Sequence, residues 1–366
     1  MTRKQYIDHT IATNHIDIHF TPSFIIFSGM SKSVNRRRFL QASAISGATL
    51  LAGCSGQSRD GTESQQESES ENETETSSPS MDESALPTAA LSIPSLEFTF
   101  FARMENAFNQ AISDGLIAEE STFYDSGNSQ SAQISDVETA VSNDVDFLMI
   151  SAITAEGVIN AIEEANAAEI PVIAIDRNVA AGKTVTYVAS DNVRLGERST
   201  ELCLEFMQQQ SDAESYNILQ LEGTPGASVT NDRGQGFQNV VNDSDNLTRL
   251  ASQTGEFSTQ QGLSVMEDFI TQYGNEIDGV FCQNDLMGLG VHQALQNSNL
   301  DVPVTGIDGT EAWVNRFSEN EFYGTIAQLP EKMVTESISQ AKAHMAGEDV
   351  DDTIPIEGLR VTQENG

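Results

Sequence analysis

Charged and amide side chains directly follow four short apolar runs of this sequence, at residues 172–175, 218–221, 280–282 and 302–307. In chain order, these side chains belong to Asp176-Arg177-Asn178, Glu222-Gly223, Gln283-Asn284-Asp285 and Asp308-Gly309-Thr310. Carboxylates accept hydrogen bonds from neighbouring hydroxyls and arginine donates them as a planar fork, so the set suits a small ligand with many hydroxyls. The alternative is that these residues are helix N-caps, and for Asp285 and Thr310 that alternative is equally good. A cap does not explain Arg177.

The apolar runs have the length of strands, and they alternate with segments of helical period. Residues 145–150 form a further strand, and residues 157–168 place four apolar side chains on one helix face. Such alternation predicts parallel sheets that helices cover on both faces, with ligands bound at the carboxyl ends of the strands. About ten strands in residues 89–366 are too many for one doubly wound sheet. We therefore predict an α/β fold with two doubly wound parallel-sheet lobes.

The N-terminus has the pattern of an export signal rather than of a fold. In residues 36–54, three arginines precede an apolar stretch that is too short to span a bilayer. Paired arginines followed by Phe39-Leu40 resemble a twin-arginine signal, and Leu51-Ala52-Gly53-Cys54 resembles a lipobox, whose cysteine becomes the first mature residue and carries the lipid. The alternative is a plain signal peptide with a chance cysteine. We interpret residues 1–53 as an incorrectly assigned start, before Met30, followed by a twin-arginine lipoprotein signal.

The charge is strongly negative, with 55 acidic and 18 basic residues and a net charge of −37. Residues 54–88 begin with the lipid-carrying Cys54 and continue as a Ser-, Thr- and Glu-rich segment that we predict to be a disordered acidic tether. The excess of acid argues against nucleic-acid binding, and it leaves the lipid as the only expected contact with a membrane. Because the acids are spread along the chain, we also expect a halophilic protein, whose self-repulsion concentrated salt screens.

Cysteine and histidine offer no set of metal ligands in this sequence. Cys203 and Cys282 lie in apolar patterns and are expected to be buried free thiols, since three cysteines do not make a disulfide framework. The closely spaced pair His15 and His19 has no further ligand nearby. We expect neither a metal nor another cofactor.

Six segments, taken together in their order and spacing, resemble one known family. They are Pro171-Val-Ile-Ala-Ile-Asp-Arg177, Ala189-Ser-Asp-Asn192, Arg233-Gly-Gln-Gly-Phe237, Phe281-Cys-Gln-Asn-Asp285, Gly306-Ile-Asp-Gly-Thr310 and Thr325-Ile-Ala-Gln-Leu-Pro330. This pattern resembles the ribose-binding-protein-like family of type I periplasmic sugar-binding proteins over residues 89–366. The resemblance implies two lobes, residues 89–190 with 329–357 and residues 191–328 with 358–366, joined by three hinge crossings. The crossings are implied near Ser190-Asp191, Gln328 and Glu357-Gly358.

The resemblance also implies which residues bind the ligand. They are Phe100, Phe101, Asp176 and Arg177 from the N-terminal lobe, and Arg233, Phe257, Asn284, Asp308 and Gln328 from the C-terminal lobe. Aromatic rings would cover the faces of a sugar while the charged groups bind its hydroxyls. One wall departs from the family, which usually has a polar Ser and an Asn-Pro before the two phenylalanines, where this chain has Pro94 and Phe98-Thr99. For Trp313 the sequence leaves two roles open: lining the entrance of the cleft or packing in the core.

The resemblance implies a monomeric, lipid-anchored binding protein on the extracellular face of the cell membrane. It would capture a ribose-like pentose or a hexose by closure of its lobes and deliver it to the permease of an ABC-type sugar importer, which a cytoplasmic ATPase drives. A cyclitol or nucleoside ligand, and a sensor for a surface signalling receptor, are the alternatives. A glycosidase built on Asp176 and Asp308 is disfavoured because the adjacent Arg177 should hold Asp176 ionised. A transcription regulator is disfavoured because an acidic coil stands where a basic DNA-binding helix would be needed.

Overall fold

A computed structural model describes residues 85–366 of the protein. The predicted export signal, the lipid-carrying Cys54, the histidine pair and all but the end of the tether lie outside the described residues. Within residues 85–366, no helix is both long and apolar enough to cross a membrane.

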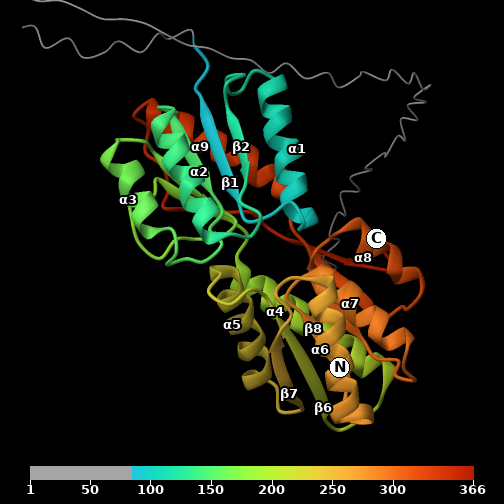
Figure 1. Cartoon of the computed structure of the whole chain (residues 1–366). Coiled ribbons are helices and arrows are strands. Elements are labelled where there is room, and N and C mark those ends of the chain that lie inside the picture. The colour runs from blue at the N-terminus through green and yellow to red at the C-terminus, as the bar shows by residue number, and fades with distance from the viewer. Residues whose placement is uncertain (1–84) are drawn as a thin grey trace, which may run out of the picture. The chain divides into compact units, whose positions relative to one another are not determined.

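The described residues form two six-stranded sheets between layers of helices (Figure 1). The first sheet has the order β11-β5-β4-β3-β1-β2, and its neighbouring strands are all parallel. Its strands are β1 (Ala89–Ile93), β2 (Thr122–Asp125), β3 (Phe147–Ile150), β4 (Val172–Ile175), β5 (Thr186–Ala189) and β11 (Thr353–Pro355). The predicted doubly wound α/β architecture is thereby confirmed for this half of the fold.

The second sheet has the order β12-β10-β9-β8-β6-β7. Its strands are β6 (Tyr216–Glu222), β7 (Leu247–Thr254), β8 (Gly279–Cys282), β9 (Val304–Asp308), β10 (Tyr323–Ala327) and β12 (Leu359–Thr362). All neighbours are parallel except β12, which pairs antiparallel with β10. The predicted parallel-sheet architecture is confirmed, with one antiparallel edge strand where the chain arrives from the other sheet through a short connection.

Helices cover both faces of each sheet. The first sheet packs with α1 (Thr99–Ser113), α2 (Gln130–Ser142), α3 (Ile159–Ala167) and α9 (Pro330–Met345). The second packs with α4 (Asn192–Gln210), α5 (Ser228–Asp243), α6 (Thr259–Tyr273), α7 (Asp285–Gln296) and the short α8 (Glu311–Val314).

Strand β3 illustrates why its sequence forms a buried strand. Phe147 and Met149 belong to the core on the α1 and α9 side, whereas Leu148 and Ile150 belong to the core on the α2 and α3 side. Successive side chains point to opposite faces of a sheet, so a strand covered on both faces must be apolar throughout. The strand begins two residues later than predicted, at a point where the Asp146 carboxylate accepts a hydrogen bond from the Thr88 backbone N–H at 2.6 Å.

The chain passes between the two sheets three times. The crossings follow β5 at Ser190 and Asp191, β10 at Gln328 and Leu329, and β11 at residues 356–358. These three connections are the crossings that the fold class implies, and the second contains Gln328, a residue predicted to bind the ligand.

Three further side chains have a settled place in this fold. Cys203 and Cys282 are buried and free, as predicted. Trp313 is fully buried, donates from its indole Nε1 to the Gly324 carbonyl at 3.1 Å, and stacks on Tyr323 at a centroid distance of 4.9 Å. Trp313 is therefore a core residue and not part of a cleft.

Candidate ligand-binding site

A small cavity lies at the carboxyl ends of the strands, between residues of the two sheets. Its lining residues are Phe98, Phe100, Phe101, Asp176, Arg177, Val229, Arg233, Phe257, Asn284, Asp308 and Gln328. All nine side chains that the resemblance implied are brought together here. Phe98, noted in the sequence only as a departure, and Val229 also line the cavity.

Asp176 and Arg177 leave the end of β4 in an unusual backbone conformation. Asp176 has φ +60°, in the left-handed region that few non-glycine residues adopt. Its N–H donates to the Val188 carbonyl at 2.9 Å, and its carbonyl accepts from the Tyr187 hydroxyl at 2.7 Å. Strained backbone held by surrounding bonds is common at functional sites, because the strain aims a side chain that relaxed geometry would not.

The Arg177 guanidinium lies between two aromatic rings. Its central carbon is 5.4 Å from the centroid of Phe101 and 5.3 Å from that of Phe257. Its Nε is 3.8 Å from Asp176 Oδ2 and has no hydrogen-bond partner, although it is buried. Burial lowers the pKa of Arg177 to about 10, while Asp176 opposes that shift, so the group stays cationic at neutral pH. A buried N–H donor therefore faces the cavity without a protein acceptor.

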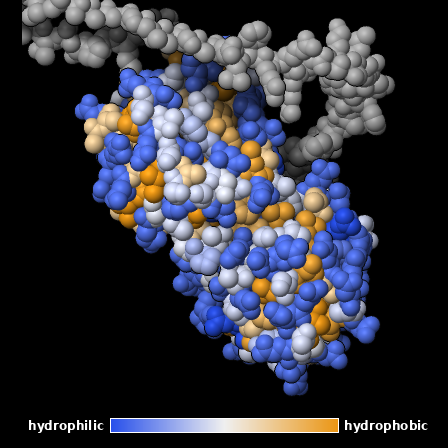
Figure 2. All heavy atoms as spheres, viewed as in Figure 1, coloured by the Kyte–Doolittle hydropathy of each residue, from blue (hydrophilic) through white to orange (hydrophobic). Residues whose placement is uncertain are grey.

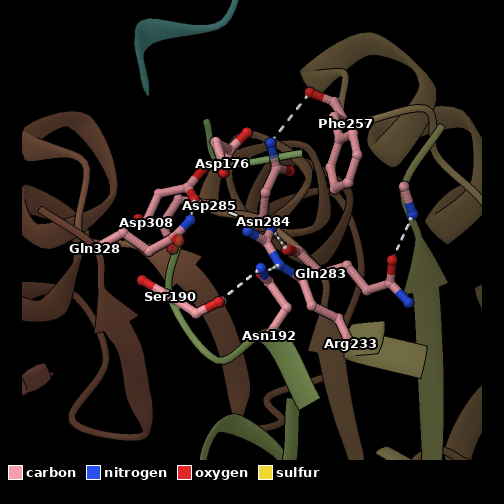
Figure 3. Close-up of polar contacts among 12 residues, drawn as sticks. Asp176, Ser190, Asn192, Arg233, Phe257, Gln283, Asn284, Asp285, Asp308 and Gln328 are labelled. Carbon is pink, nitrogen blue, oxygen red and sulfur yellow. Dashed lines mark hydrogen bonds and ion pairs between the residues drawn. The ribbon is translucent and has the colours of Figure 1, made fainter. Parts of the chain in front are cut away.

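Asp308 ends β9 in a second unusual conformation, with φ +128°. Its Oδ1 accepts from Gln328 Nε2 at 2.9 Å and lies 4.0 Å from Arg233 Nη1 (Figure 3). Burial raises the pKa of Asp308 to about 6, and the nearby Arg233 opposes that shift. The Oε1 atom of Gln328 is buried without a partner, so this side of the cavity presents a free acceptor.

Arg233 is anchored more firmly than Arg177. From α5, its Nη1 donates to the Gln283 carbonyl at 2.6 Å and its Nε to Asn192 Oδ1 at 2.9 Å. Asn192 in turn donates to the carbonyl of Ser190, in the first crossing (Figure 3). The site is thus bonded directly to a segment that joins the two sheets.

The N-cap alternative weighed in the sequence holds for Asn284 but not for Asp285. Asn284 is the N-cap of α7, since its Oδ1 accepts from the Met287 N–H at 3.0 Å, and its Nδ2 donates to the Phe257 carbonyl at 3.3 Å. Asp285 is buried and caps nothing. Its carboxylate accepts from the Thr310 N–H and the Thr325 hydroxyl, both at 2.7 Å. Asp285 thereby fastens the turn after Asp308, a role that sequence reasoning missed.

The charges of the site balance but pair loosely. Two carboxylates and two guanidinium groups, all nearly fully buried, meet at 3.8 and 4.0 Å rather than at hydrogen-bond distance. Burial raises the pKa of Asp176, and the opposing effect of the adjacent Arg177 is smaller, so the net shift is upward. Buried charges are stable only when paired and hydrogen-bonded, and a ligand rich in hydroxyls can supply the missing bonds. Within residues 85–366, no group of side chains is arranged to hold a metal ion.

Comparison with known proteins identifies the family. Residues 89–349 match the family model described as periplasmic binding protein domain. The chain is 31% identical over 285 residues to the ribose import binding protein of Haemophilus influenzae, covering 78% of this chain and 94% of that one. It is 34% identical over 254 residues to the ribose import binding protein of Bacillus subtilis, covering 68% and 80%.

A solved structure agrees with these sequence matches. The periplasmic binding protein of the arabinose ABC transporter from Shewanella sp. ANA-3, bound to L-arabinofuranose, superposes with a TM-score of 0.70 at 27% identity, covering 76% of this chain and 92% of that one. The family model spans residues 89–349, which include every residue that lines the cavity. The chain therefore belongs to the ribose-binding-protein-like family of type I periplasmic sugar-binding proteins.

Proposed function

We propose that this chain is the substrate-binding protein of an ABC sugar importer and that it captures one monosaccharide in the cavity. The single observation that carries the ligand class is the lining: two carboxylates and two arginines face a small space that aromatic rings border. The three relatives above are two import binding proteins and a transporter component, and none of them is described as an enzyme. Binding and release of a chemically unchanged sugar is the activity that fits both this lining and these relatives.

The lining of the cavity supports a single sugar ring. Its aromatic, carboxylate, guanidinium and amide groups are gathered around one small space. The aromatic side chains Phe101 and Phe257 border this space from the two lobes, so a sugar ring can pack against aromatic surface on either side of the cavity. An oligosaccharide would need an open groove instead.

Contacts between the two sheets' loops support capture by closure. The Asn178 N–H donates to the Ser228 hydroxyl at 2.8 Å, and the Ala155 N–H donates to the Gly226 carbonyl at 3.0 Å. These bonds join loops of the first sheet to the loop and helix that follow β6. A ligand that contacts both sides stabilises this closed arrangement over an open one, with the three crossings as hinges. The closed form would then be the one that the permease recognises.

Export and anchoring form a separate part of the proposal. The protein would leave the cell by the twin-arginine route and stay at the outer face of the membrane through a lipid on Cys54. Replacing Cys54 by serine should release the protein into the medium, and replacing Arg37 and Arg38 by lysine should retain it in the cytoplasm. Fractionation of cells followed by immunodetection reads both results, and an unchanged membrane fraction for Cys54→Ser would contradict the anchor.

The acidic surface supports a role in concentrated salt. Hydrophilic side chains cover most of the face drawn in Figure 2, and among the described residues the exposed large apolar side chains are Leu86, Leu116 and Leu359. We expect the protein to lose stability when salt is removed, because screening of its −37 charge falls with ionic strength. A thermal midpoint that is equal in dilute and molar salt would contradict this.

Thermal unfolding of the full chain in molar salt tests the binding function. A ligand at 100 times its dissociation constant adds about 2.7 kcal/mol of stability, which shifts the midpoint clearly. The panel should contain pentoses, hexoses, cyclitols and nucleosides. A clear rise of the thermal midpoint with one of the sugars supports the proposal. A rise with a cyclitol or nucleoside instead supports the alternative ligands. If no compound shifts the midpoint of a folded protein, the proposal is contradicted.

A further inference from the structure

Phe98 occupies a position where local structure favours a different residue. It is the N-cap of α1, with φ −86° and ψ 111°, and its side chain makes no cap hydrogen bond. Ser, Thr, Asp and Asn are preferred there because their oxygens accept from the first-turn N–H groups, as Ser129 does for α2. A residue that breaks a local preference is expected mainly where function requires it. Phe98 leaves α1 without that bond and lines the ligand cavity instead.

The Phe98 ring packs beside two other phenylalanine rings of the cavity wall. Its ring lies 6.1 Å from that of Phe101, which packs edge-on against Phe100 at 5.3 Å. Phe101 and Phe257 contact the Arg177 guanidinium, whereas Phe98 has no cation over its ring. Phe98 is only 8% exposed and carries no hydrogen-bonding atom. This wall of the cavity therefore offers a ligand apolar contact and nothing else.

Other residues of the lining are polar. Asp176, Arg177, Arg233, Asp308 and Gln328 supply charged or amide groups, and two of their buried polar atoms have no protein partner. A ligand hydroxyl directed at those groups gains a charge-assisted hydrogen bond. A hydroxyl directed at Phe98 would lose its water and gain no partner, which weakens binding.

We propose that Phe98 determines specificity, and that the ligand presents a C–H or methyl group to it where a fully hydroxylated sugar would present a hydroxyl. The ligand class is thus a deoxy sugar. This inference rests on the proposed function. It adds the prediction that the side of the sugar facing Phe98 lacks a hydroxyl oxygen. It follows from the place of Phe98, an N-cap position where a polar side chain is preferred and where this chain instead presents a phenyl ring to the cavity.

Pairs of sugars that differ by one hydroxyl test the inference. Suitable pairs are D-galactose with D-fucose, L-mannose with L-rhamnose, and D-ribose with its 2-deoxy and 5-deoxy forms. Isothermal titration of the full chain in molar salt should find, in at least one pair, that the deoxy member binds about 10- to 100-fold more tightly. Phe98→Asn should invert that preference, because the amide supplies a partner for the hydroxyl. The fold should tolerate this change, since asparagine is a favoured N-cap.

Phe98→Leu is the matched control, since it keeps the wall apolar while it removes the ring. It should weaken both members of a pair and keep the preference for the deoxy member. Tighter or equal binding of the hydroxylated member in every pair that binds would overturn the inference and leave the sugar-binding function standing. An unchanged ratio in Phe98→Asn would overturn it as well. If neither member of any pair binds a folded protein, the proposed function fails and the inference fails with it.

Discussion

The cavity contains two acid–arginine pairs that differ in how they are built. Asp176 and Arg177 are neighbours in the sequence, whereas Asp308 and Arg233 are 75 positions apart and meet only in the fold. Both aspartates lie at the carboxyl end of a strand, have a positive φ and are buried. The arginines differ: Arg233 donates two hydrogen bonds to protein oxygens at 2.6 and 2.9 Å, while Arg177 is held between rings and keeps a free Nε–H. We infer that Arg233 is a fixed part of the wall and that Arg177 is the arginine more dependent on the ligand.

The largest expected effect comes from removing the carboxylate of Asp308, the acid of the pair whose members are distant in sequence. Asp308→Ala removes a hydroxyl acceptor and leaves Arg233 buried without its carboxylate, a change that costs about 3–5 kcal/mol when a buried pair loses one partner. We expect ligand affinity to fall by at least two orders of magnitude while the protein stays folded. Titration with the best ligand of the panel measures this. Glu321→Ala, an exposed acid beside β10, is the control and should bind normally.

Matched arginine-to-lysine changes separate the two pairs. Arg233→Lys loses the fork that bonds both Gln283 and Asn192, so we expect weaker binding and also a lower thermal midpoint without ligand. Arg177→Lys breaks fewer bonds to the protein, so it should weaken binding about tenfold or more with little change in the ligand-free midpoint. Equal loss of midpoint in both variants would show that the difference in anchoring has no energetic consequence.

Acidification should weaken binding through Asp308. Burial raises the pKa of Asp308 to about 6 and also raises that of Asp176. As pH falls through about 6, the protonated carboxyl loses acceptor capacity, so affinity should drop by up to about tenfold per pH unit. The stability of the ligand-free protein should change with pH in the opposite direction to the affinity. A raised carboxyl pKa contributes stability below about pH 4, and that contribution is lost as pH rises through about 6.

The pH prediction has a histidine control. His292 is buried with a lowered pKa and contacts Glu319, so it is another group whose protonation acidification could change. Titration between pH 5 and 8 of His292→Gln should reproduce the pH dependence of the unmodified protein, whereas Asp308→Asn should flatten it. A flat profile in His292→Gln would assign the effect to the histidine instead.

The smallest expected effect concerns Ser151, which is hydrogen-bonded to the aspartate of the Asp176–Arg177 pair. The Ser151 hydroxyl donates to Asp176 Oδ2 at 3.3 Å, a long hydrogen bond in a buried site. Ser151→Ala should weaken binding only about two- to tenfold, since one hydrogen bond contributes roughly 0.5–1.5 kcal/mol. A loss as large as that of Asp308→Ala would mean that Ser151 contacts the ligand itself. Titration under the same conditions distinguishes these results.

The sequence predicted the parts of the site that are local. Strand β4 was expected at residues 172–175 and lies there, and the charged residues that follow it line the cavity. The sequence left Asp285 between a ligand role and a helix cap, because its partners Thr310 and Thr325 lie 25 and 40 residues away. It likewise left Trp313 open, since only the packing of Tyr323 against its ring puts that side chain in the core.

Composition, apolar periodicity and the order of the motifs by themselves determined the α/β class, the two lobes' sheets and the polar ends of the strands. These features depend on each residue and its near neighbours in the chain. Tertiary structure decided which arginine is anchored, which carboxyl is buried enough to shift its pKa, and that Phe98 lines the cavity instead of giving way to a helix cap. Those properties depend on distances between residues far apart in sequence and on the exclusion of water from the space between them, and neither exists until the chain has folded.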